Sequence, residues 1–132
     1  MKKHIEVVAA ILMFEDSYLT VQRGPAKLDY ISHKWEFPGG KVEKGESFEN
    51  AIVRELQEEL AITITDPQLF ITVEHCYPDF DITMHCFVVT VESPDIVLRE
   101  HVAQRWLKKE YLIDVDWAGA DIPVVRKLMS LE

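Results

Sequence analysis

The sequence predicts a mixed α/β domain in which strands and helices pack in layers. Apolar, β-branched runs fill the first third and the middle of the chain, and two helical segments stand apart from each other. No linker or internal repeat divides them. A chain of 132 residues has the length of one domain and can bury a sizeable core. We therefore expect a single domain over residues 1–132.

The first third of the chain is expected to form strands. Residues 5–14 are an apolar run and residues 18–23 a second one, and the short polar segment between them predicts a hairpin. Residues 24–34 carry a Gly-Pro pair and no periodicity, which indicates a loop. Residues 35–37 resume an extended structure, and we expect the Pro-Gly-Gly at 38–40 to break it.

The clearest helix is predicted over residues 47–61. Ser47 is a good N-cap at its start, and no Gly or Pro interrupts the segment that follows. The remaining expected elements are β-rich segments at 68–77 and 81–91 joined by a turn, a loop at 96–104, a short strand at 105–107, a helical turn at 108–113 and a closing helix at 121–131.

The charge balance of the chain excludes several classes of partner. Lys and Arg number 14 against 23 Asp and Glu, so the net charge is −9. Such a surface repels nucleic-acid polymers and anionic lipid, because both bind through basic patches. The run at residues 5–14 contains Glu6 and is too short to span a membrane. Two cysteines are too few for a disulfide framework. We expect a soluble cytoplasmic protein, monomeric by default, with a homodimer as the alternative.

Residues 54–59, with the sequence RELQEE, gather carboxylates on one helix face. At about 100° per residue, Glu55, Glu58 and Glu59 fall within an arc of roughly 100°. The apolar face of the same helix borders this arc, so these side chains lie at the edge of the core. Like charges so placed repel one another, which favours a hard divalent cation such as Mg²⁺ among them. The alternative is a solvated acidic face.

The residues before this helix strengthen the metal interpretation. Gly39 and Gly40 allow a close approach that a side chain would block, and a backbone carbonyl there could bind a metal. Lys41 adds a cation beside the glycines, and Glu46 adds a carboxylate. These features suit a metal-bound polyphosphate. A protein with a charge of −9 needs such a metal to reverse the local field for an anionic substrate.

The segment GGKVEKGESFENAIVRELQEELAI resembles the Nudix box. The matching positions, separated by five, seven and one free positions, are Gly40, Glu46, Arg54-Glu55-Leu56 and Glu58-Glu59. One departure is Ala61, where the family usually has Gly, and it puts the geometry of the helix end in question. The flanking WEFP segment and Gln22-Arg23 resemble the MutT-type branch, and the ending ADIPVVRKLM resembles the related CTP pyrophosphohydrolases.

This resemblance implies a Nudix fold, an α/β/α sandwich around a mixed β-sheet. It implies Mg²⁺- or Mn²⁺-dependent hydrolysis of a nucleoside triphosphate to a monophosphate and pyrophosphate. Arg54 would orient the carboxylates, Arg23 and Lys41 would meet phosphate, and either Glu55 or Glu100 would take the proton from water. By the same match, the metal ligands would be the Gly40 carbonyl, Glu55, Glu58, Glu59 and Glu100.

The expected base pocket centres on Asp121, where MutT-type enzymes carry an Asn that reads an oxidised guanine. An ionised Asp accepts hydrogen bonds but cannot donate them, which favours cytosine with its exocyclic amine. Phe37 and Phe80 are candidates to stack on the base. The preferred interpretation is a pyrophosphohydrolase of cytidine or modified cytidine nucleotides that cleans the nucleotide pool. The alternatives are an 8-oxo-dGTP diphosphatase and a non-catalytic nucleotide-sensing module, and for Asp121 itself a helix cap.

Overall fold

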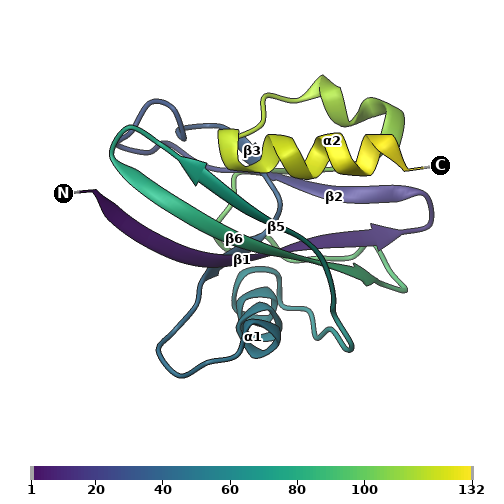
Figure 1. Cartoon of the computed structure of the whole chain (residues 1–132). Coiled ribbons are helices and arrows are strands. Elements are labelled where there is room, and N and C mark those ends of the chain that lie inside the picture. The colour runs from purple at the N-terminus through teal and green to yellow at the C-terminus, as the bar shows by residue number, and fades with distance from the viewer. Residues whose placement is uncertain (1, 132) are drawn as a thin grey trace.

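A mixed seven-stranded β-sheet lies between helix α1 (Phe48–Leu60) on one face and helix α2 (Ile122–Ser130) on the other (Figure 1). The computed structural model describes residues 2–131. The predicted α/β/α sandwich is confirmed by this arrangement. None of the helices within the described residues has the length and apolar character needed to cross a bilayer.

The long strands form the centre of the sheet. β1 runs parallel to β6 along its whole length, from Lys3 opposite Phe80 to Met13 opposite Thr90. The predicted hairpins are present, since β1 pairs antiparallel with β2 and β5 with β6. The strands are β1 (Lys3–Phe14), β2 (Ser17–Gln22), β3 (Trp35–Glu36), β4 (Gly39–Lys41), β5 (Gln68–Cys76), β6 (Phe80–Thr90) and β7 (Ala103–Lys108), and two 3₁₀ helices cover Lys109–Asp114 and Gly119–Asp121.

Two hydrophobic cores lie on opposite faces of the sheet. Successive side chains of a strand alternate between the faces. Ala9 and Ile11 of β1 therefore pack in the core beneath α2, while Val8, Ala10 and Leu12 pack in the core beneath α1. A strand that is buried on both faces has a continuous apolar sequence, and this explains the unbroken apolar run that predicted β1.

The extended structure breaks at Pro38, between β3 and β4, as predicted, but the double glycine that follows forms a strand, and this part of the prediction is wrong. Gly39 and Gly40 belong to β4, where they pair antiparallel with Ala9 and Val8 of β1. A Cβ atom added to Gly39 would lie 1.9 Å from the Val8 carbonyl oxygen. Gly39 therefore allows β4 to lie against β1 more closely than any other residue could.

Helix α1 begins and ends close to the predicted limits. Ser47 caps its start by accepting a hydrogen bond from the Asn50 amide at 3.1 Å. The helix ends at Leu60, and Ala61 follows in the left-handed conformation with φ of 56°. This is the conformation that glycine adopts at helix ends. The sequence departure at Ala61 thus keeps the usual geometry, at a cost of about 1 kcal/mol for its side chain.

Candidate active site

Arg54 on α1 connects the acidic residues around the double glycine. Its guanidinium donates to both carboxylate oxygens of Glu46, at 2.8 and 2.9 Å. It also donates to Glu55 Oε1 at 2.8 Å, to Glu58 Oε2 at 3.3 Å and to the Lys41 carbonyl oxygen at 3.0 Å. The hydrogen bonds from Arg54 lower the pKa of Glu46 to about 2. Because a guanidinium offers its donors in a rigid plane, Arg54 fixes the orientation of these groups relative to β4.

Glu59 is the most deeply buried carboxylate of the helix, with 2% of its surface exposed. Burial, followed by the negative charges of Glu100, Glu55 and Glu36, raises its pKa to about 9. Its Oε2 atom has no hydrogen-bond partner in the part of the chain that the structure describes. A buried carboxyl group without a partner is unfavourable. The position therefore calls for a cation that would let Glu59 ionise.

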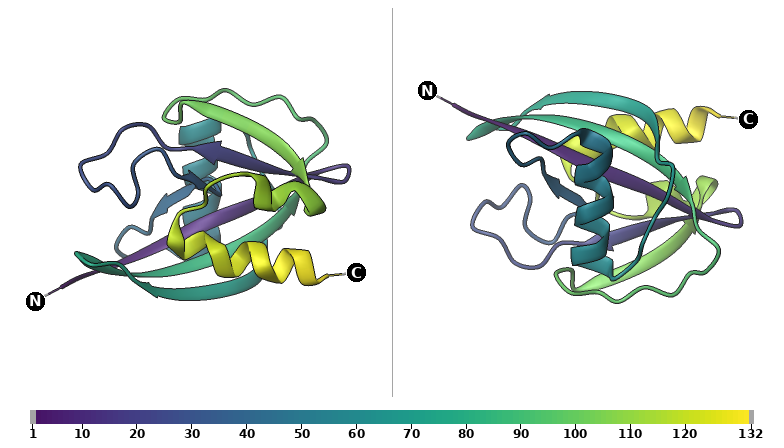
Figure 2. Two further views of the ribbon diagram at one scale, coloured as in Figure 1. Left: turned by 90° about the horizontal axis from the view of Figure 1, so that it is seen from above. Right: turned by 90° about the horizontal axis from the view of Figure 1, so that it is seen from below.

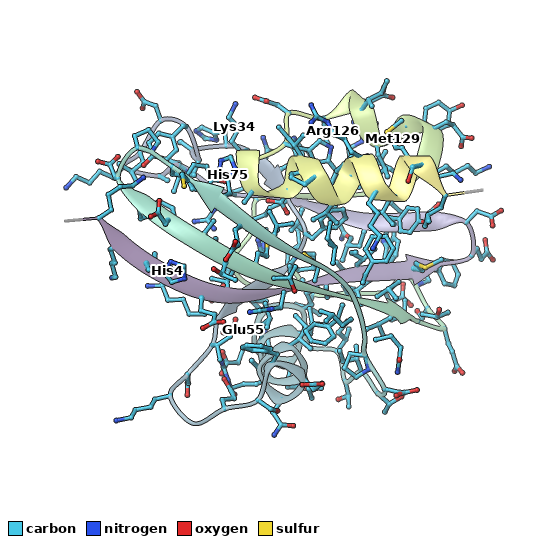
Figure 3. All side chains as sticks on the ribbon, viewed as in Figure 1. His4, Lys34, Glu55, His75, Arg126 and Met129 are labelled. Atoms are coloured by element: carbon cyan, nitrogen blue, oxygen red, sulfur yellow. The ribbon has the colours of Figure 1, made fainter. Side chains whose placement is uncertain are left out.

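Glu55 lies between α1 and the sheet (Figure 3), and its side chain is 14% exposed. A Cβ atom on Gly40 would lie 2.3 Å from its Oε2 atom. Burial, opposed by Arg54, raises the pKa of Glu55 above its ordinary value. The missing side chain of Gly40 thus leaves the space that the Glu55 carboxylate occupies. Glu58 lies at the rim of the same cluster, with its side chain 57% exposed.

The oxygen atoms that could act as metal ligands in this cluster fit a hard divalent cation. They are carboxylate oxygens and one backbone carbonyl, the ligand types that Mg²⁺ prefers, and the unpaired Glu59 Oε2 is among them. Between residues 2 and 131, no three acidic, histidine or cysteine side chains already converge on one point. Mg²⁺ keeps several waters and takes substrate phosphate oxygens as ligands, so it needs no complete protein cage.

A cavity of about 410 Å³ opens beside the carboxylates, between the sheet and the loop at residues 24–34. That loop connects β2 to β3 and extends away from the sheet (Figure 2). The structure brings together at this cavity every residue that the sequence analysis assigned to phosphate or base, together with one proposed metal ligand. These lining residues are Arg23, Phe37, Gly40, Lys41, Phe80 and Asp121.

Asp121 lies in the wall of the cavity and is 4% exposed. Its Oδ1 atom accepts a hydrogen bond from the Phe37 amide at 3.1 Å. It makes no side-chain capping bond to α2, so the helix-cap alternative is wrong. Burial, with a smaller contribution from the negative charge of Glu36, raises the pKa of Asp121 well above its ordinary value. Burial therefore acts against the expected ionised form of Asp121 and favours the neutral form, and a neutral carboxyl group can donate a hydrogen bond as well as accept one.

The two phenylalanines occupy different positions in the cavity wall. Phe37 is buried and packs against Trp117, with 4.7 Å between the ring centroids. Phe80 is partly buried and packs against Tyr77, with a centroid distance of 5.0 Å. Phe37 is thus a fixed part of the core, whereas Phe80 has free surface to offer to a planar ligand.

Glu36 and His101 also belong to the site, although neither is among the site residues predicted from the sequence. Glu36 accepts hydrogen bonds from Arg23 at 3.1 Å and from His101 Nε2 at 2.9 Å. Glu36 also lines the cavity, and its charge acts on both Glu59 and Asp121. The position of Glu36, three residues before the double glycine, could have suggested a role in the site. Its partner His101 could not have been found in this way, because it is 65 positions away in the sequence.

The sandwich has a carboxylate side chain against its double-glycine strand and an apolar cavity that the same strand lines, and with the relatives reported below it defines a class of protein: hydrolases of diphosphate bonds. Comparison with known proteins identifies the family. The family model described as NUDIX domain matches residues 2–128. The chain belongs to the NUDIX family, which confirms the resemblance found in the sequence.

Its relatives are of the MutT-like type. The chain is 34% identical over 129 residues to the 8-oxo-dGTP diphosphatase of Escherichia coli K12, covering 98% of this chain and 99% of that protein. It is 38% identical over 129 residues to the CTP pyrophosphohydrolase of the same organism, covering 98% and 94%. The solution structure of the E. coli ORF135 protein matches with a TM-score of 0.83 at 38% identity, covering 98% of this chain and 91% of that one.

Proposed function

We propose that the protein is a Mg²⁺-dependent pyrophosphohydrolase that converts a nucleoside triphosphate to a monophosphate and pyrophosphate. The observation that carries this proposal is the buried Glu59 carboxyl group, whose Oε2 has no partner among the described residues, under the charges of Glu55 and Glu100 and near a cavity that Arg23 and Lys41 line. Anionic groups are concentrated where a cation must sit, and cationic groups lie where phosphates must sit. The names of the two E. coli relatives support a nucleotide substrate.

The proposed roles follow the positions of the side chains. Mg²⁺, or alternatively Mn²⁺, would be held by the carboxylates of Glu55, Glu58, Glu59 and Glu100 and the Gly40 carbonyl. When bound, the metal neutralises the polyphosphate and lowers the pKa of coordinated water.

The chain itself would carry the remaining steps. Arg54 orients Glu55 and Glu58, and Arg23 and Lys41 bind the phosphates. Glu55 or Glu100 accepts the proton of the attacking water. The water oxygen bonds to the β-phosphorus, and the bond from that phosphorus to the α–β bridging oxygen breaks. The nucleoside monophosphate is then the leaving group, and the water oxygen ends in pyrophosphate.

We infer that Asp121, whose pKa is raised by burial, meets the base as a neutral carboxyl group. A neutral carboxyl group presents one donor and one acceptor side by side. Cytosine offers the complement at N3 and N4, and an oxidised guanine offers it at O6 and N7–H, but adenine also offers it at N7 and N6, so this pairing alone does not select one base. We favour cytidine or modified cytidine nucleotides, and 8-oxo-dGTP is the second candidate, because the two E. coli relatives are named as a CTP pyrophosphohydrolase and an 8-oxo-dGTP diphosphatase.

We place the activity in the cytoplasmic nucleotide pool, where it would remove unwanted triphosphates. The two free cysteines of the described chain agree with a reducing compartment. A non-catalytic nucleotide sensor is disfavoured, because such a module would not need the full set of Glu55, Glu58, Glu59 and Glu100.

The test is a panel of canonical, methylated and oxidised triphosphates with Mg²⁺, ranked by kcat/KM. We expect a monophosphate and pyrophosphate as products, with the highest kcat/KM for a cytidine or 8-oxo-guanine nucleotide. In ¹⁸O-labelled water the label should enter pyrophosphate. Release of orthophosphate, or label in the monophosphate, would contradict the proposed reaction, and nucleotide binding without turnover would favour the sensor.

Substitutions of Asp121 test its proposed neutral form. Asp121→Asn keeps one donor and one acceptor, so we expect kcat/KM for the best substrate within several-fold of wild type. Asp121→Ala removes both, and kcat/KM should fall about a hundredfold, mainly through KM. Thermal melting of both variants controls for loss of structure at this buried site. If Asn is as harmful as Ala, an ionised Asp121 reads the base instead.

A further inference from the structure

The segment at residues 91–102 carries Glu100 to the carboxylate cluster. Its first half is attached to the end of α1, because the Val97 amide donates to the Leu60 carbonyl and the Arg99 amide to the Glu59 carbonyl, both at 3.1 Å. The last carbonyls of a helix lack partners within the helix, and these two amides supply them. Glu100 therefore follows directly after an anchor on the helix that carries the acidic cluster.

The far side of the segment is attached to the sheet. The Val102 amide donates to the Gln22 carbonyl of β2 at 3.0 Å. Between this anchor and the one at Arg99, the described structure contains one further attachment, the bond from His101 Nε2 to Glu36 Oε2 at 2.9 Å. Glu36 in turn is held by Arg23 at 3.1 Å. The side chain of His101 thus attaches the short stretch between the anchors at Arg99 and Val102 to β3.

The chemistry of His101 suits a fixed structural bond. Its side chain is 6% exposed, and a carboxylate can only accept hydrogen bonds, so Nε2 carries the proton that is donated to Glu36. Its Nδ1 atom is buried and has no hydrogen-bond partner within residues 2–131. Among the described residues, Glu36 is therefore the one hydrogen-bond partner of the His101 ring.

Glu100 needs such an attachment. Its charge acts unfavourably on both Glu55 and Glu59, and like charges in a partly buried site repel. Across the described residues, the Glu100 carboxylate has no hydrogen bond of its own to hold it there. Glu100 is exposed, so no packing encloses its carboxylate, and we expect the repulsion to turn it away from the cluster once the bond from His101 is lost.

We propose that His101 is a positioning residue, whose hydrogen bond to Glu36 holds Glu100 in place for the divalent cation. The inference rests on the proposed function, because it takes Glu100 as a ligand of the catalytic metal. Partners that orient metal ligands typically change metal affinity by ten- to a hundredfold when they are removed. Loss of the His101 bond should therefore be visible in metal binding itself.

The first experiment measures Mn²⁺ binding to the purified protein without nucleotide, by the electron paramagnetic resonance signal of free Mn²⁺. His101→Phe keeps a ring but loses the N–H donor, and we expect its Mn²⁺ affinity to fall about tenfold. His101→Gln keeps a donor and should recover part of that loss. His101→Asn, too short to reach Glu36, should behave like His101→Phe and replaces it if the Phe variant does not fold. Equal Mn²⁺ affinity in all variants would overturn the proposal.

The second experiment is a double-mutant cycle with Glu100→Gln. If His101 acts through Glu100, His101→Phe should not weaken Mn²⁺ binding further in the Glu100→Gln protein. A tenfold loss in that background as well would show that His101 acts elsewhere and would overturn the proposal. Because neither experiment requires turnover, both remain decisive if the protein hydrolyses no triphosphate, so a failure of the proposed function is seen separately.

Discussion

Replacing Glu59 with Gln is expected to lower kcat by about a thousandfold and, at the same time, to stabilise the protein in the absence of metal. The loss of turnover follows because Gln cannot supply the negative charge that a divalent cation requires at the centre of the cluster. The gain in stability follows because Glu59 is buried without a partner for its Oε2 atom, and Gln has the same shape without the charge.

The expected gain in stability follows from the pH dependence of the free energy of unfolding. The ordinary pKa of glutamate, 4.5, is raised to about 9 at Glu59 in the folded protein. In the unfolded chain the group loses its proton near pH 4.5, whereas in the folded protein it holds the proton until about pH 9. Folding without metal therefore becomes less favourable as pH rises through this window. At pH 7 the difference amounts to about 3 kcal/mol, which the Gln variant should regain.

The measurement combines kinetics and unfolding. Turnover is followed with Mg²⁺, and urea unfolding is followed in EDTA at pH 5 and pH 8. Glu58→Gln is the matched control, because its side chain is 57% exposed: turnover should fall there too, but stability should not rise. Wild-type turnover of Glu59→Gln would remove Glu59 from the catalytic centre. An unchanged free energy of unfolding at pH 8 would show that the buried carboxyl group is not destabilising.

The sequence was sufficient to predict the acidic helix and its place at the edge of the core. Helical periodicity placed Glu55, Glu58 and Glu59 on one face, and Ser47 marked the start of α1. Periodicity could not rank their burial, since the surroundings of Glu59 include Glu36 and Glu100, whose charges act on it from distant segments of the chain. Local patterns describe one element at a time, whereas the burial of a side chain is decided by the elements packed against it.

The same limit explains what the sequence analysis misjudged. The double glycine has the local signature of a chain break, but pairing with β1 makes it a strand. Asp121 has the signature of a helix cap, but in the buried cavity wall its carboxyl group accepts from the Phe37 amide, and burial raises its pKa. In both cases a tertiary contact replaced the role that local sequence suggests.

The two glycines of β4 offer a matched pair of substitutions with opposite expected effects. In Gly40→Ala, the new Cβ atom would meet the end of the Glu55 side chain at 2.3 Å. That side chain is flexible and can rotate away, so the fold should survive with little change in stability. The Glu55 carboxylate would then be displaced from the cluster by an ångström or more. Displacements of this size cost about a hundredfold in rate, and we expect kcat to fall accordingly.

In Gly39→Ala, the Cβ atom would meet backbone instead, at 1.9 Å from the Val8 carbonyl oxygen and 2.7 Å from Ala9 Cα. β1 is central and buried on both faces, so it cannot move aside, and β4 must separate from it. We expect a loss of about 3 kcal/mol and a fall in Tm of about 10 °C. Each variant controls for the other when Tm and kcat are measured on both. A Gly40→Ala protein with full activity would show that Glu55 need not lie against β4, and a Gly39→Ala protein that melts like wild type would contradict the close packing of β4 on β1.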